Sequence, residues 1–416
     1  MSVERLSTCV KDKEYQSRNV SPPKEFPNKQ RLRILAISTS FYPKMDGFIR
    51  AVDNQCKVLH EAGHSVYLLT GEKKRNHDDT QHRFATTRVR INGRRGTRVL
   101  SYPSLALRFY LEAKDIIVRE NIQLTYAYGL LPGFCSLLIK LRKKTPFVLA
   151  LTDLSSLVPH PGQAENTRMR IARAAVRILL TRADVVVFPT SYAGAKLESS
   201  LRVKITRPTI VVPDGVDARR FAASCEDRET HTVLYVGNLR RRKGLEDIVQ
   251  ASKAVIRGIP TAKFVLVGEG VSRRELEESI SRNALTPNFE LPGRVTEEQL
   301  TRFYSEADVY VVPTRFDAYP TSILEAMAAG KPVITTRGSV ADLEGIVVPG
   351  FTGLLVPIGD IDSLSASITA LLSDRVKSRA MGERGREIVV RNHDVAIVEE
   401  RIERALEMAI GGKGLR

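Results

Sequence analysis

The sequence predicts an α/β protein made of two doubly wound domains, each a parallel sheet covered by helices on both faces. Three observations support this prediction. The chain has 416 residues, which is longer than a domain with a single hydrophobic core usually is. Short, continuously apolar segments alternate with segments at helical spacing, as expected for strands buried on both faces. The alternation restarts after residues 209–221, which divides the chain into two similar halves.

The first half opens with a strand in RLRILAIST, which runs into the loop SFYPKMDGF. The next segment places Val52, Cys56 and Leu59 at helical spacing, and Gly63 ends this helix. Further strands are predicted in HSVYLLT, PFVLALT and ADVVVFPT. Residues 1–30 are charged and lack an apolar core, so we expect a disordered leader rather than a secretory signal.

The second half repeats this order with strands in HTVLYVGN, AKFVLVGEG, FELPG, ADVYVVPT and KPVITT, each separated by a helix. We therefore expect one domain over residues 31–213 and a second over residues 214–392. Ligands of such sheets bind beyond the carboxyl ends of the strands. A cleft between two domains is a frequent ligand site as well.

The composition is that of a basic globular protein. Lys and Arg number 64 against 47 Asp and Glu, a formal net charge of +17. An anionic partner explains this balance (nucleotide, acidic lipid or nucleic acid), and a solvated basic surface explains it equally well. The four cysteines are scattered without a C-x-x-C pair, which favours reduced thiols in a cytosol. The seven histidines suggest no metal cluster, and no apolar run is long enough to span a bilayer.

The segment RFDAYPTSILEAMAAGKP contains two acids eight residues apart, after a predicted strand end. Thr321 or Ser322 can cap the following helix, and Gly330 can end it. The amino end of this helix is suited to a phosphate. Glu325, one turn in, could accept hydrogen bonds from ribose hydroxyls, and Asp317 could reach a second ring beyond the phosphates. A capped helix with two solvated acids is the alternative.

A second segment, YVGNLRRRKGLEDIVQA, carries four consecutive cations on a tight turn. Like charges crowded on a turn repel each other unless an anion neutralises them. Lys243, just before Gly244, is well placed to meet a diphosphate; an exposed basic loop is the alternative. FVLVGEG and LPGRV add two glycine turns at strand ends, where the backbone can approach a flat base.

In this order, these motifs, together with ADVYVVPT and GFTGLLV, resemble the retaining glycosyltransferases of the GT-B fold, group 1 (family 4). The resemblance runs from about residue 34 to residue 410 and includes PDGVDARRF near the domain junction. It implies two Rossmann-like domains facing across a cleft, with a C-terminal helix, residues 393–416, crossing back to the first domain. It also implies metal-independent transfer of a hexose from a nucleotide-diphosphate donor, a UDP- or GDP-sugar, with no further cofactor.

Carried over residue by residue, the resemblance assigns roles on the donor side. Glu325 matches the ribose-binding acid, and Asp317 lies near the donor sugar where a Glu is commoner. Lys243 matches the diphosphate lysine. Its usual arginine partner is replaced by Asn238, and we expect Arg242 to substitute, with Arg241 and Arg240 as alternatives. The further donor-binding residues implied are Gly47, Gly237, Gly268, Arg294, Val295, Tyr319, Thr321 and Ser322.

The acceptor side matches less well. Asp46 replaces the first glycine of the loop that ends at Gly47. The family often has a His in the segment that here reads LALTDLSSLVPHPG, and this position has none. Asp153 and His160 are the acceptor-side candidates that remain. An inactive relative, an epimerase and a phosphorylase stay open, whereas nucleic-acid binding is disfavoured because no aromatic–basic motif or helix-turn-helix signature occurs.

The segment ENTRMRIARAAVRILLTRADV suggests a surface for a partner. Its helical pattern aligns Arg170, Arg173 and Arg177, and most apolar residues lie elsewhere around the helix. Such a helix can rest on an anionic membrane, or form a solvated stripe over core contacts. We expect a cytoplasmic protein, and the first alternative would make it peripheral on the inner face of a membrane, with a lipid-linked acceptor. The acceptor is otherwise expected to be a glycan.

Overall fold

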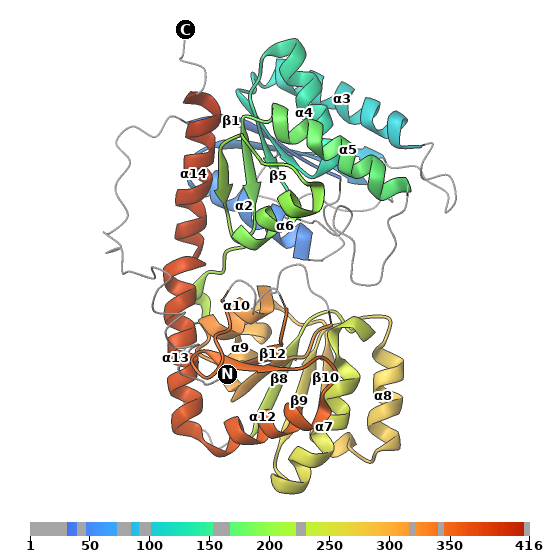
Figure 1. Cartoon of the computed structure of the whole chain (residues 1–416), viewed down its shortest axis with the longest axis vertical. Coiled ribbons are helices and arrows are strands. Elements are labelled where there is room, and N and C mark those ends of the chain that lie inside the picture. Colours follow the sequence, from blue (N-terminus) through green and yellow to red (C-terminus); the bar gives the residue numbers. More distant parts are fainter. Residues whose placement is uncertain are drawn as a thin grey trace. The chain divides into compact units, whose positions relative to one another are not determined.

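The computed structural model confirms two α/β domains with parallel sheets (Figure 1). It describes residues 31–39, 47–72, 85–90, 101–152, 167–221, 230–315, 321–339 and 345–411. The predicted leader, residues 1–30, lies outside these ranges. The predicted domain limits after residues 213 and 392 stay predictions.

The first sheet has seven strands in the order β3-β2-β1-β4-β5-β6-β7, and each neighbouring pair is parallel. The order reverses at β1, so β1 and β4 flank a topological switch point. The strands are β1 Arg33–Ser38, β2 Ser65–Glu72, β3 Ala85–Arg90, β4 Leu124–Tyr128, β5 Phe147–Ala150, β6 Val185–Phe188 and β7 Thr209–Val211.

Helices cover both faces of this sheet, as the apolar strands require. Within β1, Ile34 and Ala36 belong to the core shared with α2 and α14, whereas Leu35 and Ile37 belong to the core shared with α3 and α4. Side chains of a strand alternate between its faces, so a strand buried on both sides is continuously apolar. The helices are α2 Gly47–Glu61, α3 Ser101–Arg119, α4 Leu130–Lys143, α5 Thr167–Arg182 and α6 Ser191–Leu201.

The second sheet has six parallel strands in the order β10-β9-β8-β11-β12-β13. Its core includes β8, β9, β11 and β12 together with α7, α10, α12 and α13. The strands are β8 Thr232–Val236, β9 Lys263–Val267, β10 Phe289–Gly293, β11 Val309–Val312, β12 Val333–Thr336 and β13 Gly353–Val356. The helices are α7 Leu245–Gly258, α8 Arg273–Arg282, α9 Glu297–Glu306, α10 Thr321–Ala328, α12 Ile361–Ser373 and α13 Arg375–Asn392, with short 3-10 turns η2 Ala218–Phe221, η3 Arg241–Lys243 and η4 Thr286–Asn288.

Every strand predicted from an apolar run is present, and four further strands were not predicted. β3 (ATTRVR) is a polar edge strand, β7 has three residues and β13 has four, so their apolar signals are weak. β4 (LTYAY) carries two tyrosines and a threonine, yet all five residues are buried. Burial between two helix layers, rather than composition, makes β4 a central strand.

The last helix, α14 Val395–Gly411, packs against the first domain although it follows the second in the chain. Ile402 and Leu406 are buried in the core with β1 and β4. At the edge of this contact the Nδ1 atom of His64 accepts from the Leu32 N–H at 3.1 Å, so its Nε2–H donates to Glu403 at 2.9 Å. Because both partners are buried, this bond ties α14 to the start of β2.

The segment that leads from the first domain to the second is also held by the C-terminal region. The Val216 N–H donates to the His393 carbonyl at 2.9 Å. Asp214 is buried in this segment, and its Oδ1 atom has no hydrogen-bond partner among the described residues. Burial raises the pKa of Asp214 to about 7. Burial is also the main cause that raises the pKa of Tyr128 well above its usual value, and the charge of Asp214 makes a smaller contribution in the same direction.

Candidate active site

Three glycine turns interlock at the carboxyl edge of the second sheet, where the sequence predicted a ligand. The Gly237 N–H donates to the Val267 carbonyl at 3.0 Å, and the Gly268 N–H donates to Gly293 at 2.9 Å. A Cβ atom on Gly268, whose φ is +134°, would lie 1.9 Å from the Gly237 carbonyl oxygen. Only glycine fits there, so the turns after β8, β9 and β10 pack as one bare backbone surface.

The cationic turn that contains Lys243 is fixed against the exit of β11. The carbonyl of Arg242 accepts from the Arg315 N–H at 2.8 Å and from the Thr314 hydroxyl at 3.2 Å. Gly244 has φ +72°, and a Cβ atom there would lie 2.0 Å from the Pro313 carbonyl oxygen. This packing brings the turn next to the segment that leads into α10, although the two are about 70 residues apart in sequence.

The cations of this turn differ in their surroundings. Arg241 pairs with Glu275 of α8 at 2.9 Å and thereby lowers the pKa of that carboxyl. An acid within the protein therefore reduces part of the repulsion between the four consecutive cations. Arg242 is exposed and Lys243 is half-buried. Beside them, Arg315 pairs with the buried Asp247 at 3.0 Å, which anchors the exit of β11 to α7.

Helix α10 begins at Thr321, so neither Thr321 nor Ser322 caps it from outside, contrary to the prediction. Both residues lie in its first turn, where backbone N–H groups have no acceptor within the helix. The helix ends as predicted: Gly330 has φ +69°, and its N–H donates to the Met327 carbonyl at 2.9 Å. The amino end of α10 therefore keeps the positive partial charge that favours an anion.

Two tyrosines position the first turns of α10, and neither was predicted from the sequence as part of the site. The hydroxyl of Tyr304, from α9, donates to Glu325 Oε2 at 2.8 Å. The hydroxyl of Tyr310, in β11, lies 2.7 Å from Ser322 Oγ and 3.1 Å from the Val236 carbonyl. A buried tyrosine hydroxyl usually has a hydrogen-bond partner, and this general rule was the signal in the sequence that could have pointed to the two tyrosines. Glu325 is thus a half-buried carboxylate held in one orientation.

The remaining predicted residues divide into two groups. Asn238 follows the turn at Gly237, and its carbonyl accepts from the Tyr235 hydroxyl at 3.1 Å. Arg294 follows β10 and is exposed, whereas Val295 packs against the core of the second sheet. Gly47 is the first residue of α2. The predicted residues outside the described ranges are Asp46, Asp153, His160, Asp317 and Tyr319.

The described part of the chain contains no group of three or more His, Cys, Asp or Glu side chains that could hold a metal ion. The described cysteines, Cys56 and Cys135, are free and buried, and burial raises the pKa of each thiol to about 12. Both are therefore inert core residues at neutral pH.

A second surface combines apolar and basic residues on the first domain. Helices α3, α4 and α5 cover one face of its sheet (Figure 1). All three expose large apolar side chains, namely Leu107, Leu111, Val118, Leu138, Leu141, Ile171 and Ile178. Exposed cations such as Arg142, Lys143 and Arg170 belong to the same helices. No helix among the described residues is both long and apolar enough to cross a bilayer.

The predicted arginine stripe of α5 is only partly available to a partner. Arg173 and Arg177 donate to the carbonyls of Ser200 and Leu201, the latter at 2.8 Å. Cations at these positions complement the carboxyl end of α6. The structure gives Arg170 no such bond to a described residue, and Arg170 lies next to Ile171, which is 63% exposed.

Comparison with known proteins identifies the family. A model of the glycosyl transferases group 1 matches residues 218–388, and a model of Glycosyltransferase Family 4 matches residues 45–220. Together they span nearly all of the described part of the chain. The chain belongs to the group 1, family 4 glycosyltransferases, a retaining family of GT-B fold whose members use nucleotide-sugar donors.

Individual relatives agree with this assignment. A GDP-mannose-dependent monoacylated alpha-(1-6)-phosphatidylinositol monomannoside mannosyltransferase of Corynebacterium glutamicum is 29% identical over 258 residues, 57% of this chain and 65% of that protein. Sucrose-phosphate synthase of Thermosynechococcus elongatus has a similar structure, with a TM-score of 0.76, 24% identity, and coverage of 92% of this chain and 100% of that chain. HepE of Anabaena, solved with UDP and glucose, has a TM-score of 0.72, 18% identity, and coverage of 91% and 100%.

Proposed function

We propose that this protein transfers a hexose, with retention, from a UDP- or GDP-sugar to a lipid-linked acceptor, a soluble glycan being the alternative acceptor. The observation that carries the donor half of this proposal is the hydrogen bonding of the Arg242 carbonyl to Thr314 and Arg315. It joins the Lys243 turn to the segment that leads to α10. A cationic turn and a helix amino end thus converge on one edge of the sheet, as binding a diphosphate requires.

Each described residue then has a role set by its chemistry. Lys243 and Arg242 neutralise the diphosphate together with the N–H groups of Thr321 and Ser322. Glu325 accepts hydrogen bonds from the ribose hydroxyls, and the Tyr304 hydroxyl positions it for this task. The bare backbone at Gly237, Gly268 and Gly293 lets the nucleoside lie close to the sheet edge. Arg294 and Val295 directly follow Gly293 and are proposed to contact the nucleoside as well.

The proposed reaction is a front-side displacement. Charge grows on the β-phosphate of the donor as the anomeric bond breaks, and the cations and helix amino end are already fixed where this charge develops. The leaving phosphate oxygen takes the proton of the acceptor hydroxyl, so no separate base is needed. Asp317 is proposed to contact the donor sugar, and Asp46, Asp153 and His160 to lie on the acceptor side. Closure of the domains about the segment near Val212–Asp217 would keep water out.

Donor hydrolysis tests this proposal directly. UDP- and GDP-hexoses are incubated with the protein in EDTA, and release of the nucleoside diphosphate is measured. We expect release from at least one donor and a drop of about tenfold or more in Lys243→Ala. Lys263→Ala is the matched control, because this exposed lysine begins β9 at the other edge of the sheet. No release from any donor would favour an inactive relative, and epimerisation of the donor sugar would favour the epimerase alternative.

The surface of α3, α4 and α5 supports the lipid-linked acceptor and a cytoplasmic, peripheral location on an anionic membrane. Exposed apolar side chains beside cations can insert at the boundary of headgroups and acyl chains. Basic residues near such a surface each add about 1 kcal/mol of attraction to anionic lipid. We propose a partner at this surface because three neighbouring helices each expose two or more large apolar side chains.

Sedimentation with vesicles tests the location separately from the chemistry. The full chain should sediment with phosphatidylglycerol-rich vesicles and stay in solution with phosphatidylcholine vesicles. Leu141→Glu and Ile171→Glu should each weaken sedimentation severalfold. Val376→Glu is the control, since Val376 is 82% exposed on α13 of the second domain. Equal loss in all three variants, or no preference for anionic vesicles, would remove the support for a membrane-bound acceptor.

A further inference from the structure

The segment that joins the two domains enters the core of the second sheet directly after the junction. Val212 is buried in the core of the first sheet, whereas Val216 is buried in the core of the second. Phe221, the last residue of η2, is 6% exposed and belongs to the core of the second sheet as well. The joining segment is therefore packed on both sides of the junction, and η2 is part of the second domain.

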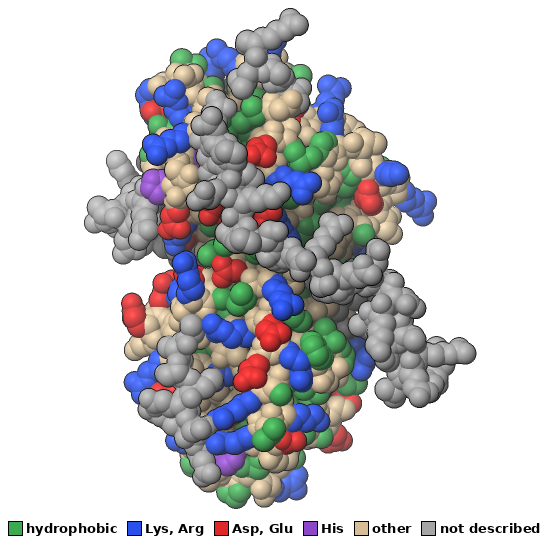
Figure 2. Space-filling view, turned by 90° about the vertical axis from the view of Figure 1, so that its left-hand side faces the viewer, with side chains coloured by type: hydrophobic (Ala, Val, Ile, Leu, Met, Phe, Trp, Pro, Cys, Tyr) green, Lys and Arg blue, Asp and Glu red, His purple; other side chains and the backbone are tan. Residues whose placement is uncertain are grey.

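Groups of the C-terminal region hold η2 in place. The Ala218 N–H donates to Asp394 Oδ2 at 3.2 Å. Arg386, on α13, donates to the Phe221 carbonyl at 3.4 Å and to the Ala328 carbonyl at the end of α10. Figure 2 faces α13 and α14 and shows acidic and basic side chains mixed on that side of the molecule, whereas Arg386 is half-buried. Because one guanidinium bonds both carbonyls, Arg386 ties η2 to α10.

The ring of Phe221 packs against Tyr304 of α9. The two rings meet edge to face, with centroids 5.5 Å apart and an interplanar angle of 88°. Tyr310 is a second ring neighbour of Tyr304, with centroids 6.0 Å apart. Tyr304 is fully buried, and a ring in a close-packed interior cannot turn unless its neighbours move. Phe221 and Tyr310 together therefore fix the direction of the Tyr304 ring.

The hydroxyl of Tyr304 connects this aromatic cluster to the candidate active site. It donates to Glu325 Oε2 at 2.8 Å and lies 3.2 Å from the Ser322 carbonyl. A hydrogen bond weakens steeply when its distance or angle departs from the optimum. The direction of the Tyr304 ring therefore bears on how the Glu325 carboxylate is oriented. Phe221 reaches that carboxylate through one side chain, although it directly follows the junction of the domains.

We propose that Phe221 is a positioning residue for the donor: through Tyr304 it holds Glu325 in the orientation that accepts hydrogen bonds from the ribose hydroxyls. This inference rests on the proposed function, because it takes Glu325 as the ribose contact. Arg386 supports the same arrangement, since it fixes the backbone of Phe221 relative to α10. A carboxylate that is ordered before binding loses less freedom when the donor arrives. The segment between the domains thus contributes to donor affinity without touching the donor.

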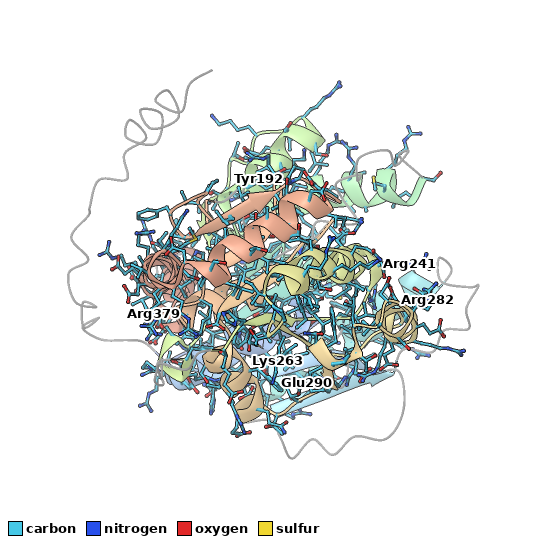
Figure 3. All side chains as sticks on the ribbon, turned by 90° about the horizontal axis from the view of Figure 1, so that it is seen from below. Tyr192, Arg241, Lys263, Arg282, Glu290 and Arg379 are labelled. Carbon is cyan, nitrogen blue, oxygen red and sulfur yellow. The ribbon has the colours of Figure 1, made fainter. Side chains whose placement is uncertain are left out.

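A second aromatic pair of the same domain provides a matched control. Phe289 stacks on Phe264 with ring centroids 5.0 Å apart, and it packs on the same core as Phe221. The pair lies where β9 and β10 begin, at the amino edge of the sheet. Figure 3 shows its sequence neighbours Lys263 and Glu290 close together and apart from Arg241 of η3. Phe289→Leu therefore removes a ring from this core away from the candidate active site.

The experiment measures binding to the full chain by calorimetry. The probes are UDP, GDP and the 2′,3′-dideoxy analogue of whichever binds more tightly. We expect Phe221→Leu to weaken the nucleoside diphosphate about fivefold, the size of one lost hydrogen bond. Binding of the dideoxy analogue should not change, because it lacks the ribose hydroxyls. Phe289→Leu should lower stability in urea but change neither affinity. Arg386→Lys should give a smaller loss with the same dependence on the hydroxyls, and it serves as the test if Phe221→Leu does not fold.

A double-mutant cycle separates positioning through Tyr304 from a general loosening of the domain. In Tyr304→Phe the bond to Glu325 is already absent, so adding Phe221→Leu should cause no further loss of nucleoside diphosphate affinity. A residue that acts only by stabilising the domain would instead weaken binding by the same factor in both backgrounds. Glu325→Gln is measured alongside as the reference for loss of the ribose contact itself.

Four results would overturn the inference: unchanged affinity in Phe221→Leu and Arg386→Lys, an equal loss for the dideoxy analogue, an equal loss in Phe289→Leu, or losses of Phe221→Leu and Tyr304→Phe that add in the double variant. If Glu325→Gln weakens binding and Phe221→Leu does not, only this inference fails. If the wild type binds neither UDP nor GDP, the proposed function fails and this inference fails with it.

Discussion

Replacing Asp214 by Asn should stabilise the protein at neutral and alkaline pH. Asp214 is 4% exposed in the segment between the two domains, and its Oδ1 atom is unpaired among the described residues. The ionised form of Asp214 is therefore the unfavourable one in the folded protein.

The magnitude follows from the pKa, and its sign from linkage. Burial raises the pKa of Asp214 from 3.8 to about 7. Between these two pH values the folded state binds more protons at Asp214 than the unfolded state does. The contribution of Asp214 to the free energy of unfolding is therefore highest below about pH 4 and falls as the pH rises to about 7. At about 1.4 kcal/mol per pH unit, the total cost of ionisation is about 4 kcal/mol. Asn cannot ionise and escapes this cost.

Urea denaturation of the wild type and of Asp214→Asn between pH 4 and pH 8.5 measures the difference. We expect the gain in unfolding free energy to be near zero at pH 4 and to reach about 4 kcal/mol above pH 7. Asp217→Asn is the control, because this carboxylate is in the same segment but partly solvated and paired with Arg219 at 3.1 Å. A gain that does not change with pH, or one that is largest at pH 4, would refute the reasoning.

The remaining predictions concern the donor site. Lys243→Ala should weaken nucleoside diphosphate binding by about 1.5–3 kcal/mol and barely change nucleoside binding; equal losses would mean that Lys243 does not meet the diphosphate. Glu325→Gln should weaken the binding of nucleoside diphosphates and of all the corresponding nucleotide sugars, as measured by calorimetry. Tyr304→Phe should weaken the same ligands by about 1 kcal/mol, since Glu325 loses its orienting bond, and an unchanged affinity would contradict this role. Asp317→Asn should lower turnover and sugar discrimination but leave nucleoside diphosphate affinity nearly intact, whereas Asp317→Glu should stay active.

The arrangement of the site explains why these variants should differ. Glu325 and Ser322 contact the hydroxyls of Tyr304 and Tyr310, so the side of the site proposed for the ribose is ordered without ligand. The turn that contains Lys243 is held through its backbone at Arg242 and Gly244, next to the proposed position of the diphosphate. Preorganised contacts contribute to the affinity of every donor, whereas a contact made only by the sugar shows in turnover.

The fold class and the ligand edge could be predicted from the sequence because both depend on local pattern. Apolar runs of four to six residues between helical segments define parallel strands buried on both faces, and the carboxyl ends of such strands always meet at one edge. β3 and β7 escaped prediction for the same reason: a polar edge strand and a three-residue strand leave little local signal. The family motif from Ala307 to Pro332 is likewise a contiguous stretch.

Only the tertiary structure decided which partners the functional side chains have. Arg241 looked like part of a free cationic run, yet it pairs with Glu275, and Glu325 looked like a solvated acid, yet Tyr304 orients it. Charge pattern and spacing report the neighbours of a residue along the chain, whereas burial and pairing depend on residues brought close by folding. For this reason the sequence indicated the edge of the sheet where we propose that a ligand binds, whereas the packing of distant segments decided the charge and geometry of that edge.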